Sequence, residues 1–436
     1  MNLAVRLLVG VAWVMALVAG SVSAEEPRHT IEQTADQTVV RVLATDQKVS
    51  SEDLIAALTE VADLDGQVLI KRLPHGDLDL TKRRTLASLH LVEKSLKGRA
   101  EIGVERDANG VVQALLVVFD RAKIEQGKLH SKETSRKWIK SIGAATGHSV
   151  EELAWGLRGL DTLMPKPGQP VIVLIHGFQG NHDSLADLQQ ILTQNEFANV
   201  TFAYPNDGAI ADAARQLAVE LREATVLRDS PLILVTHSMG GLVARRLIED
   251  PDLDDRRVRQ LLMIAPPNGG SNLAYLPFTT DWYEHLKERP VDGLPDFVFR
   301  SSMDGLNEAQ HDLRPDSRFL LDLNARPRNP RVRYSILLGT KSPATPEQLD
   351  SVSRKLESLT NKSDTVQLFA PRLRKIFDHP LELTPGSGDG AVAVERGQLV
   401  GVDDVVTLPT DHWTATKTLD TEEGRQLVQE VLQRLR

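Results

Sequence analysis

Short runs of consecutive apolar residues alternate with amphipathic segments through the second half of the chain. The apolar runs occupy residues 171–175, 200–203, 232–235, 260–265 and 334–338. A strand that is buried on both faces of a parallel sheet has this pattern. Between these runs, apolar residues recur with the spacing of a helix, most clearly at residues 184–193 and 209–224. The alternation predicts an α/β fold with a doubly wound, mostly parallel sheet, which ends in an amphipathic helix at residues 421–436.

The preceding region has a different pattern, and residues 25–165 predict a smaller α+β domain. Strands are expected at residues 38–43, 67–73, 100–105 and 111–119, and helices at 50–62, 80–96 and 122–157. Asp107-Ala108-Asn109-Gly110 lies between the last two strands and is a good hairpin turn. Residues 164–170 then contain three prolines, which is typical of a linker, so the second domain is expected at residues 166–436. We find no motif that assigns a role to the first domain.

Residues 1–24 are expected to be a signal peptide. Arg6 precedes an apolar stretch at residues 7–20, and Val22-Ser23-Ala24 supplies small residues before Glu25. This is the order of a charged region, an apolar region and a cleavage site. The alternative, a single membrane anchor, fits less well because a span needs about 20 apolar residues. Cleavage after Ala24 predicts an exported protein, periplasmic or extracellular, without a stable membrane span.

Composition narrows the function classes. With 436 residues, 41% hydrophobic and 25% charged, the chain has the composition of an ordinary globular protein. The formal net charge of −9 and the lack of Lys/Arg blocks argue against a nucleic-acid partner. The chain has no cysteine, which excludes disulfides, thiolate metal sites and a cysteine nucleophile. No motif in the sequence indicates an oligomeric state.

The clearest candidate for chemistry is Ser238, which lies between an apolar strand and a predicted helix that begins near Met239. A serine on such a sharp turn is exposed at the sheet edge, above the N–H groups of the helix start. Small residues are needed two positions before and after it, because the backbones nearly touch there. Those residues are Thr236 and Gly240, so the motif is a variant at its first position.

A nucleophilic serine needs a histidine base and an orienting carboxylate. Asp389 lies in a glycine-flanked loop, and His412 follows a predicted strand at residues 402–408, just before the final helix. The chain order serine, acid, histidine is that of one hydrolase architecture. Three other acids are rivals for the orienting role: Asp403, Asp404 and Asp411.

The first apolar strand leads into a His176-Gly177 turn. The backbone N–H of Phe178, together with that of Met239, is expected to form an oxyanion hole. We expect His176 to shape the turn rather than transfer protons, and His176 and Gly177 to border the substrate. His237, next to the serine, is expected to point elsewhere and to pack.

From about Pro170 to its end, the chain resembles the α/β-hydrolases of the lipase and esterase kind. The resemblance is carried by these motifs: the oxyanion turn His176-Gly177, the elbow Thr236 to Gly240, the acid loop Asp389 to Val392 and the late Asp411-His412. It implies hydrolysis of an acyl-ester or lipid substrate through an acyl-enzyme, without a cofactor. Ser238 would attack the carbonyl, His412 would relay the proton, and Asp389 would orient the imidazole.

Two departures from the family pattern matter. Bacterial lipases of this kind often bind calcium through an aspartate just beyond the histidine, where Trp413 and Thr414 stand here. Many also carry a disulfide, which this chain cannot form. We therefore predict no metal site.

Residues 266–331 form an insertion between two predicted strands and hold a dense group of aromatic residues in a chain with only 4% aromatics. Tyr275, Phe278 and Trp282 are expected to bind substrate. The insertion is either a cap over the serine or an ordinary helical segment that buries its own core.

The favoured function is therefore an exported serine ester hydrolase. An acyltransferase or thioesterase with the same triad is the enzymatic alternative, because the sequence does not encode which acceptor takes the acyl group. A third alternative is a non-catalytic binding protein on a hydrolase scaffold.

Overall fold

The structure is a computed structural model. It describes residues 28–34, 37–61, 65–70, 76–95, 100–120, 155–166, 168–178, 180–205, 208–275, 308–342, 344–360, 367, 370–419 and 421–436. The chain divides into two compact units. The larger unit comprises Leu153–Ser302, Leu306–Lys355 and Lys375–Arg436, and the smaller comprises Met1–Glu152, Met303–Gly305 and Leu356–Arg374. In the part of the chain described, no helix is long and apolar enough to cross a membrane.

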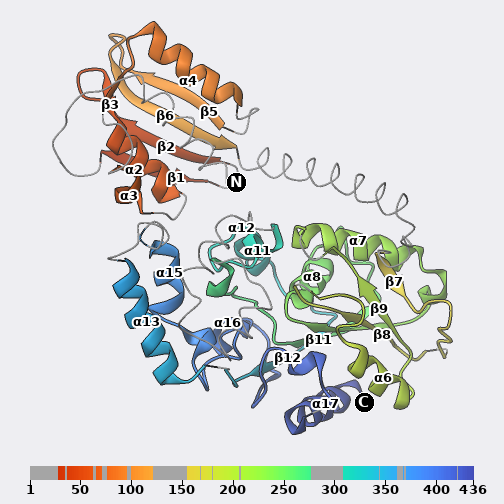
Figure 1. Ribbon diagram of the computed structural model, residues 1–436. Helices are drawn as coiled ribbons and strands as arrows, with labels where there is room; N and C mark the ends of the chain where they lie inside the picture. The colour runs from red at the N-terminus through yellow and green to blue at the C-terminus, as the bar shows by residue number, and fades with distance from the viewer. Residues whose placement is uncertain are drawn as a thin grey trace, which may run out of the picture. The chain divides into compact units, whose positions relative to one another are not determined.

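The smaller unit is built on a four-stranded antiparallel sheet (Figure 1). Its strands, in spatial order, are β1 (His29–Gln33), β2 (Gln37–Leu43), β6 (Val112–Asp120) and β5 (Ala100–Arg106). Its other elements are β3 (Lys48–Ser50), α2 (Ser51–Val61), α3 (Gly66–Ile70), β4 (Asp77–Asp79) and α4 (Arg83–Ser95). The predicted hairpin turn is present, with Gly110 at φ +82° and its N–H bonded to the carbonyl of Asp107.

One element of this unit differs from the sequence prediction. The strand expected at residues 67–73 is wrong, because residues 66–70 form the short helix α3. A Cβ on Gly66 would lie 2.5 Å from Oγ1 of Thr59 in α2, so the glycine lets the two helices approach closely. The apolar run Val68-Leu69-Ile70 is too short to distinguish a strand from a helical turn. Of the helix expected at 122–157, only residues 155–157 are described, and there the prediction is wrong, because Gly156–Arg158 form a strand.

The larger unit contains a seven-stranded sheet, and all five predicted buried strands are confirmed. Its spatial order is β13 (Val405–Leu408), β12 (Arg333–Gly339), β11 (Val258–Ile264), β10 (Leu232–His237), β8 (Val171–Ile175), β9 (Asn199–Ala203) and β7 (Gly156–Arg158). Neighbouring strands are parallel except for β7, which pairs antiparallel with β9. Because β7 precedes the proline-rich segment at 164–170, the sheet also includes residues upstream of that segment.

Helices cover both faces of this sheet. Figure 1 shows α7 (Ile210–Glu223) and α8 (Met239–Ile248) on one side of the strands, and α6 (Ala186–Gln194) and α17 (Glu422–Leu435) on the other. Along β10, Leu232 and Leu234 join the core cluster of α7 and α8, whereas Ile233 and Val235 join that of α6 and α17. The alternation follows from strand geometry, in which successive side chains point to opposite faces.

The remaining helical elements connect the strands. They are η2 (Thr225–Leu227), η3 (Asn272–Tyr275), α11 (Glu308–Asp312), α12 (Arg318–Asn324), α13 (Pro346–Thr360), α15 (Ala370–Phe377), η4 (Leu381–Leu383), α16 (Val394–Gly397) and η5 (Thr414–Thr416). The sequence analysis assigned no element to α13 or α15. The connections that leave the carboxyl ends of the parallel strands lie at the same sheet edge, where ligands bind in open α/β sheets.

Candidate active site

Ser238 occupies a sharp turn at the carboxyl end of the central strand β10. Its backbone has φ 51° and ψ −127°, and helix α8 begins at the next residue. The turn is fixed on both sides: the Ser238 N–H donates to the carbonyl of Ile264 at 2.8 Å, and the Ser238 carbonyl accepts from Gly241 N–H at 2.9 Å. This is the strained strand-to-helix turn that a nucleophile elbow requires.

The two small positions of the elbow have different surroundings. A Cβ on Gly240 would lie 2.6 Å from the carbonyl oxygens of both Ile175 and His176, so no side chain fits there. Thr236 is fully buried within β10, with Oγ1 3.4 Å from the carbonyl of Leu262. The close approach therefore occurs after the serine, and the structure accommodates threonine before it.

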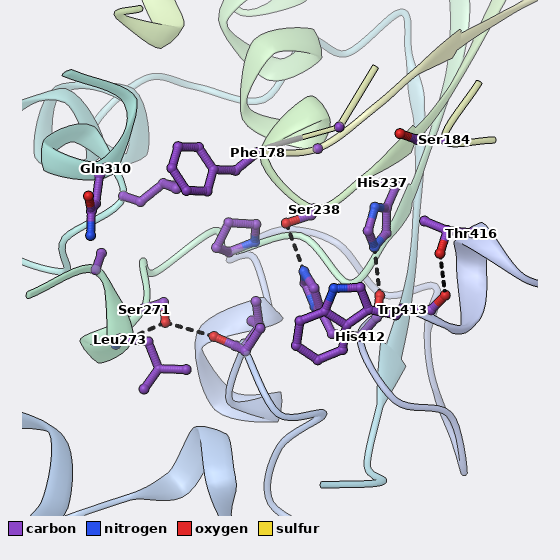
Figure 2. Close-up of a pocket in the computed structure, with 17 residues that line it drawn as sticks. Phe178, Ser184, His237, Ser238, Ser271, Leu273, Gln310, His412, Trp413 and Thr416 are labelled. Carbon is purple, nitrogen blue, oxygen red and sulfur yellow. Dashed lines mark hydrogen bonds between the residues drawn. The ribbon is translucent and has the colours of Figure 1, made fainter. Parts of the chain in front are cut away.

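Three side chains predicted to work together form a continuous hydrogen-bonded chain. His412 Nε2 lies 2.9 Å from Ser238 Oγ (Figure 2), and His412 Nδ1 lies 2.8 Å from Asp389 Oδ2. The other carboxylate oxygen of Asp389 accepts from the N–H groups of Ala391 and Val392, at 2.9 and 2.7 Å. The backbone N–H of His412 also donates to the carbonyl of Asp389. The acid and the histidine are thus fixed to each other by backbone as well as side chain.

The rival acids are engaged elsewhere. The carboxylate of Asp404 is hydrogen bonded to Arg434, and that of Asp411 accepts from the Trp413 N–H and the Thr414 hydroxyl. The carboxylate of Asp403 is not the partner of the His412 ring, whose Nδ1 is bonded to Asp389 Oδ2. Among the described residues, Asp389 supplies the carboxylate that is bonded to the His412 ring.

A cavity of about 240 Å³ opens in front of Ser238 (Figure 2). It is lined by Gly177, Phe178, Gly180, Ser184, His237, Ser238, Pro267, Ser271, Leu273, Ala274, Gln310, Leu313, Ala391, Val392, His412, Trp413 and Thr416. The Phe178 ring and Leu273 lie to one side of the serine, whereas Trp413 and Thr416 lie on the side of His412. The cavity therefore has an apolar end and a histidine end, with the serine between them.

The oxyanion turn lies directly against the elbow. A Cβ on Gly177 would be 2.8 Å from Ser238 Cβ, which leaves room for glycine alone. The His176 ring stacks on Tyr204 at 4.3 Å, and the Tyr204 hydroxyl donates to the His176 carbonyl at 2.7 Å. Burial lowers the pKa of His176 to about 4, so its imidazole is neutral at pH 7. Gly177 lines the cavity, while His176 anchors the turn from behind and is not among the lining residues.

Of the three aromatic residues expected to bind substrate, the structure describes Tyr275, which is not among the residues that line the cavity. Tyr275 is buried in η3, with Arg314 and Lys375 over its ring at 5.1 and 4.3 Å, and its neighbours Leu273 and Ala274 line the cavity instead. Phe278 and Trp282 lie outside the described residues. The alternatives for the insertion at 266–331 therefore both remain.

His237 is the residue whose placement the sequence reasoning missed. Rather than pointing away, it lines the cavity, and its Nε2 lies 2.8 Å from the carbonyl oxygen of His412 (Figure 2). The alternation along β10 contains the signal: His237 shares the face of Ile233 and Val235, which is the face that α17 covers. Because His412 lies shortly before α17, the two histidines meet. No metal-binding group of three His, Cys, Asp or Glu occurs among the described residues.

Comparisons with known proteins place the larger unit. The model of the Alpha/beta hydrolase family matches residues 172–400, a little more than half of the chain. A search of curated proteins finds no match. Similar solved structures include the mature form of a lipase from Bacillus licheniformis, which is 20% identical, with 62% of this chain and 94% of that chain covered and a TM-score of 0.42.

Two further solved structures are similar at lower scores. A metagenomic carboxyl esterase is 18% identical, with 62% of this chain and 78% of that chain covered and a TM-score of 0.35. A monoacylglycerol lipase from Paleococcus ferrophilus is 16% identical, with 62% and 95% covered and a TM-score of 0.32. The family match spans the parallel sheet from β8 to the acid loop, and the chain belongs to the alpha/beta hydrolase family.

Proposed function

We propose that this protein is a serine carboxylester hydrolase of the lipase and esterase type. The observation that supports it most strongly is the hydrogen-bonded chain from Asp389 through His412 to Ser238. It begins at a strained elbow and ends at a buried carboxylate, the arrangement that makes a serine hydroxyl nucleophilic at neutral pH.

Each of the three hydrogen-bonded residues has its own role in the reaction. Ser238 Oγ attacks the ester carbonyl carbon, while His412 Nε2 takes the hydroxyl proton. Asp389 accepts the Nδ1–H of His412, which fixes the tautomer that leaves Nε2 free to act as a base. The same Nε2–H then protonates the departing alcohol, and water attacks the acyl-enzyme in a second cycle to release the acid.

The tetrahedral oxyanion is stabilised by backbone donors. Met239 is the first residue of α8, so its N–H has no partner within the helix. The N–H of Phe178 lies on the turn packed against the serine. Removal of one donor of this kind typically costs about 3–4 kcal/mol of transition-state stabilisation.

The cavity orients the substrate about the serine. The leaving alcohol must lie on the side of His412, because Nε2 has to protonate its oxygen. The acyl chain then lies on the opposite side, against apolar residues such as Phe178, Leu273 and Leu313. An apolar acyl group is the chemical class that such a surface binds.

The test is a chain-length series of p-nitrophenyl esters, with Ser238→Ala as the decisive variant. Ser230→Ala is a matched control, because Ser230 lies at the opposite, amino end of β10. We expect hydrolysis by the natural chain and by Ser230→Ala, and background rates with Ser238→Ala. Equal hydrolysis by all three proteins would remove the support for an esterase. A product ester formed with an added alcohol, in place of free acid, would favour the acyltransferase alternative.

Export is a separate part of the proposal and depends on residues 1–24 alone. Val22-Ser23-Ala24 before Glu25 supports cleavage after Ala24. N-terminal sequencing of the protein from periplasmic and extracellular fractions tests it. A mature chain that begins at Glu25 is expected, and an intact Met1 in the exported fraction would contradict it.

A further inference from the structure

We propose that His237 is a positioning residue, which donates its Nε2–H to the carbonyl oxygen of His412 and thereby keeps the His412 ring at the Ser238 hydroxyl. This inference rests on the function proposed above, because it gives His237 a role only if His412 is the base. The hydrogen bond of the His237 ring goes to the His412 carbonyl, whereas Ser238 Oγ and the Asp389 carboxylate are bonded to the His412 ring.

The hydrogen bond joins two parts of the chain that are far apart in sequence. His237 is the last residue of β10, and His412 lies in the loop between β13 and η5, 175 residues later. The donor–acceptor distance is 2.8 Å, and the two rings are tilted by 46° with centroids 4.9 Å apart. Both residues are buried, at 6% and 7% exposure. Water therefore does not compete readily for the bond.

The direction of the bond follows from the protonation state of His237. Burial lowers the pKa of His237 to about 3, so the ring is neutral at pH 7 and carries one N–H. A carbonyl oxygen only accepts, hence the proton is on Nε2 and Nδ1 is unprotonated. Nδ1 lies on the side of the oxyanion turn, because a Cβ on Gly177 would be 3.3 Å from it. His237 thus lies between the oxyanion turn and the loop that carries His412.

The bond matters because the other hydrogen bonds of His412 do not provide the same restraint. Its N–H and Nδ1 are bonded to Asp389, so histidine and acid would shift together if their loops moved. The bond from Ser238 to Nε2 is the reacting bond, which changes as the proton moves. The bond from His237 stays intact through that step and ties the base to the strand that ends at the nucleophile. A displacement of about 1 Å in such a site can reduce the rate about 100-fold.

Three substitutions separate positioning from packing. The side-chain amide of His237→Gln extends to about the place of Nε2 and donates to the same carbonyl. His237→Leu fills a comparable volume and has no donor, and His237→Asn is polar but too short to reach the carbonyl. A packing role predicts that Gln and Leu behave alike, whereas positioning predicts that Gln rescues the activity that Leu and Asn lose.

The experiment measures kcat and KM of the full chain for p-nitrophenyl butyrate, with thermal unfolding as a check on each variant. We expect kcat to fall about 10- to 100-fold in His237→Leu and His237→Asn, with KM within about twofold of the natural protein. His237→Gln should keep kcat within about fivefold. If Leu prevents folding, the comparison of Gln with Asn gives the same answer. Equal kcat in Gln and Asn, whether both high or both low, would overturn the proposal.

A structural measurement separates this proposal from the proposed function. In crystals of His237→Asn, the distance from His412 Nε2 to Ser238 Oγ should exceed hydrogen-bonding range, and in His237→Gln it should not. An unchanged distance in His237→Asn would refute positioning, whatever the activity. Absence of ester hydrolysis by the natural protein, with the distance changed as expected, would refute the proposed function and leave the restraint itself established.

Discussion

Ser238 is held in a backbone conformation that residues other than glycine rarely adopt. A non-glycine residue with φ 51° and ψ −127° typically costs about 1–3 kcal/mol, and such strain persists only where surrounding structure imposes it. Here the N–H and the carbonyl of Ser238 are both hydrogen bonded, and Gly177 and Gly240 leave no space for relaxation. The strain is consistent with a serine that is oriented before substrate arrives.

Thr236→Gly should retain activity and lose stability. Thr236 is buried in β10 and does not line the cavity, so kcat should stay within about twofold of the natural value. Loss of its side chain and the greater freedom of glycine should lower the free energy of unfolding by about 1–2 kcal/mol. Denaturant titration and ester kinetics measure the two effects. A folded but inactive variant would show that the threonine has a role beyond packing.

The buried histidines predict a loss of stability in acid. His176 and His237 have folded pKa values of about 4 and 3 against an ordinary 6.5, so the unfolded chain binds protons that the folded chain does not. Their contribution is therefore complete above pH 6.5 and falls below it, by about 1.4 kcal/mol per pH unit for each histidine.

The test compares the free energy of unfolding at pH 7 and pH 5 in the natural protein and in His237→Gln. The variant should lose about 2 kcal/mol less between the two values. Since Glu249 and Glu382 have pKa values raised by burial, which act in the opposite direction, the difference between the proteins is the relevant quantity. Parallel curves would mean that His237 titrates normally in the folded protein.

At the scale of elements, the apolar runs were sufficient to predict the buried parallel strands along the chain. Strands buried on both faces appear as short continuous apolar runs, and Ser238 and His412 lie just beyond the ends of two of the strands, β10 and β13. The segment at residues 67–73 failed because a short apolar run fits either helix or strand. The bond from His237 to His412 depends on tertiary contact between β10 and a loop 175 residues away, which no local pattern specifies.

Gly339→Ala should separate the acid from the base. Gly339 ends β12, where a Cβ would lie 2.8 Å from Asp389 Cβ and 2.4 Å from the carbonyl oxygen of Thr410. The added methyl group must displace the acid loop or the residues just before His412, so we expect kcat to fall at least about 10-fold. Gly103→Ala is the matched control, because its Cβ would meet only Leu116 Cβ, at 4.0 Å. Full activity in Gly339→Ala would contradict the account of this contact.

A buried ion pair connects the carboxyl end of α8 to neighbouring segments of the larger unit. Arg245 of α8 and Glu249, the residue that follows the helix, have fully buried side chains 3.1 Å apart, and Arg245 also donates to Asn268 and Asn324. Arg245→Met leaves the Glu249 carboxylate buried with less compensation, which should cost about 3–5 kcal/mol of unfolding free energy. Arg245→Met with Glu249→Leu should cost less in a urea titration. A double variant less stable than the single one would contradict this.

At the scale of the whole molecule, family, fold and chemistry agree in one half of the chain. The family model matches residues 172–400. The candidate triad lies at the carboxyl ends of the parallel strands of the seven-stranded sheet. Sequence was informative there because buried strands and reactive turns have restrictive residue requirements. In the smaller unit the sequence predicted elements but no function, because an antiparallel sheet needs only alternating apolar positions and so constrains no chemistry. Neither a motif nor the fold indicates what the smaller unit does.

The central claim is that Ser238 is the nucleophile, and its covalent labelling tests this most directly. The protein is treated with a fluorophosphonate, digested with trypsin, and the peptide between Arg228 and Arg245 is fragmented in a mass spectrometer. We expect one adduct, on Ser238, in step with loss of ester hydrolysis, and no adduct in Ser238→Ala. Hydrolysis that survives in Ser238→Ala, or an adduct on another residue that accompanies inactivation, would contradict the claim.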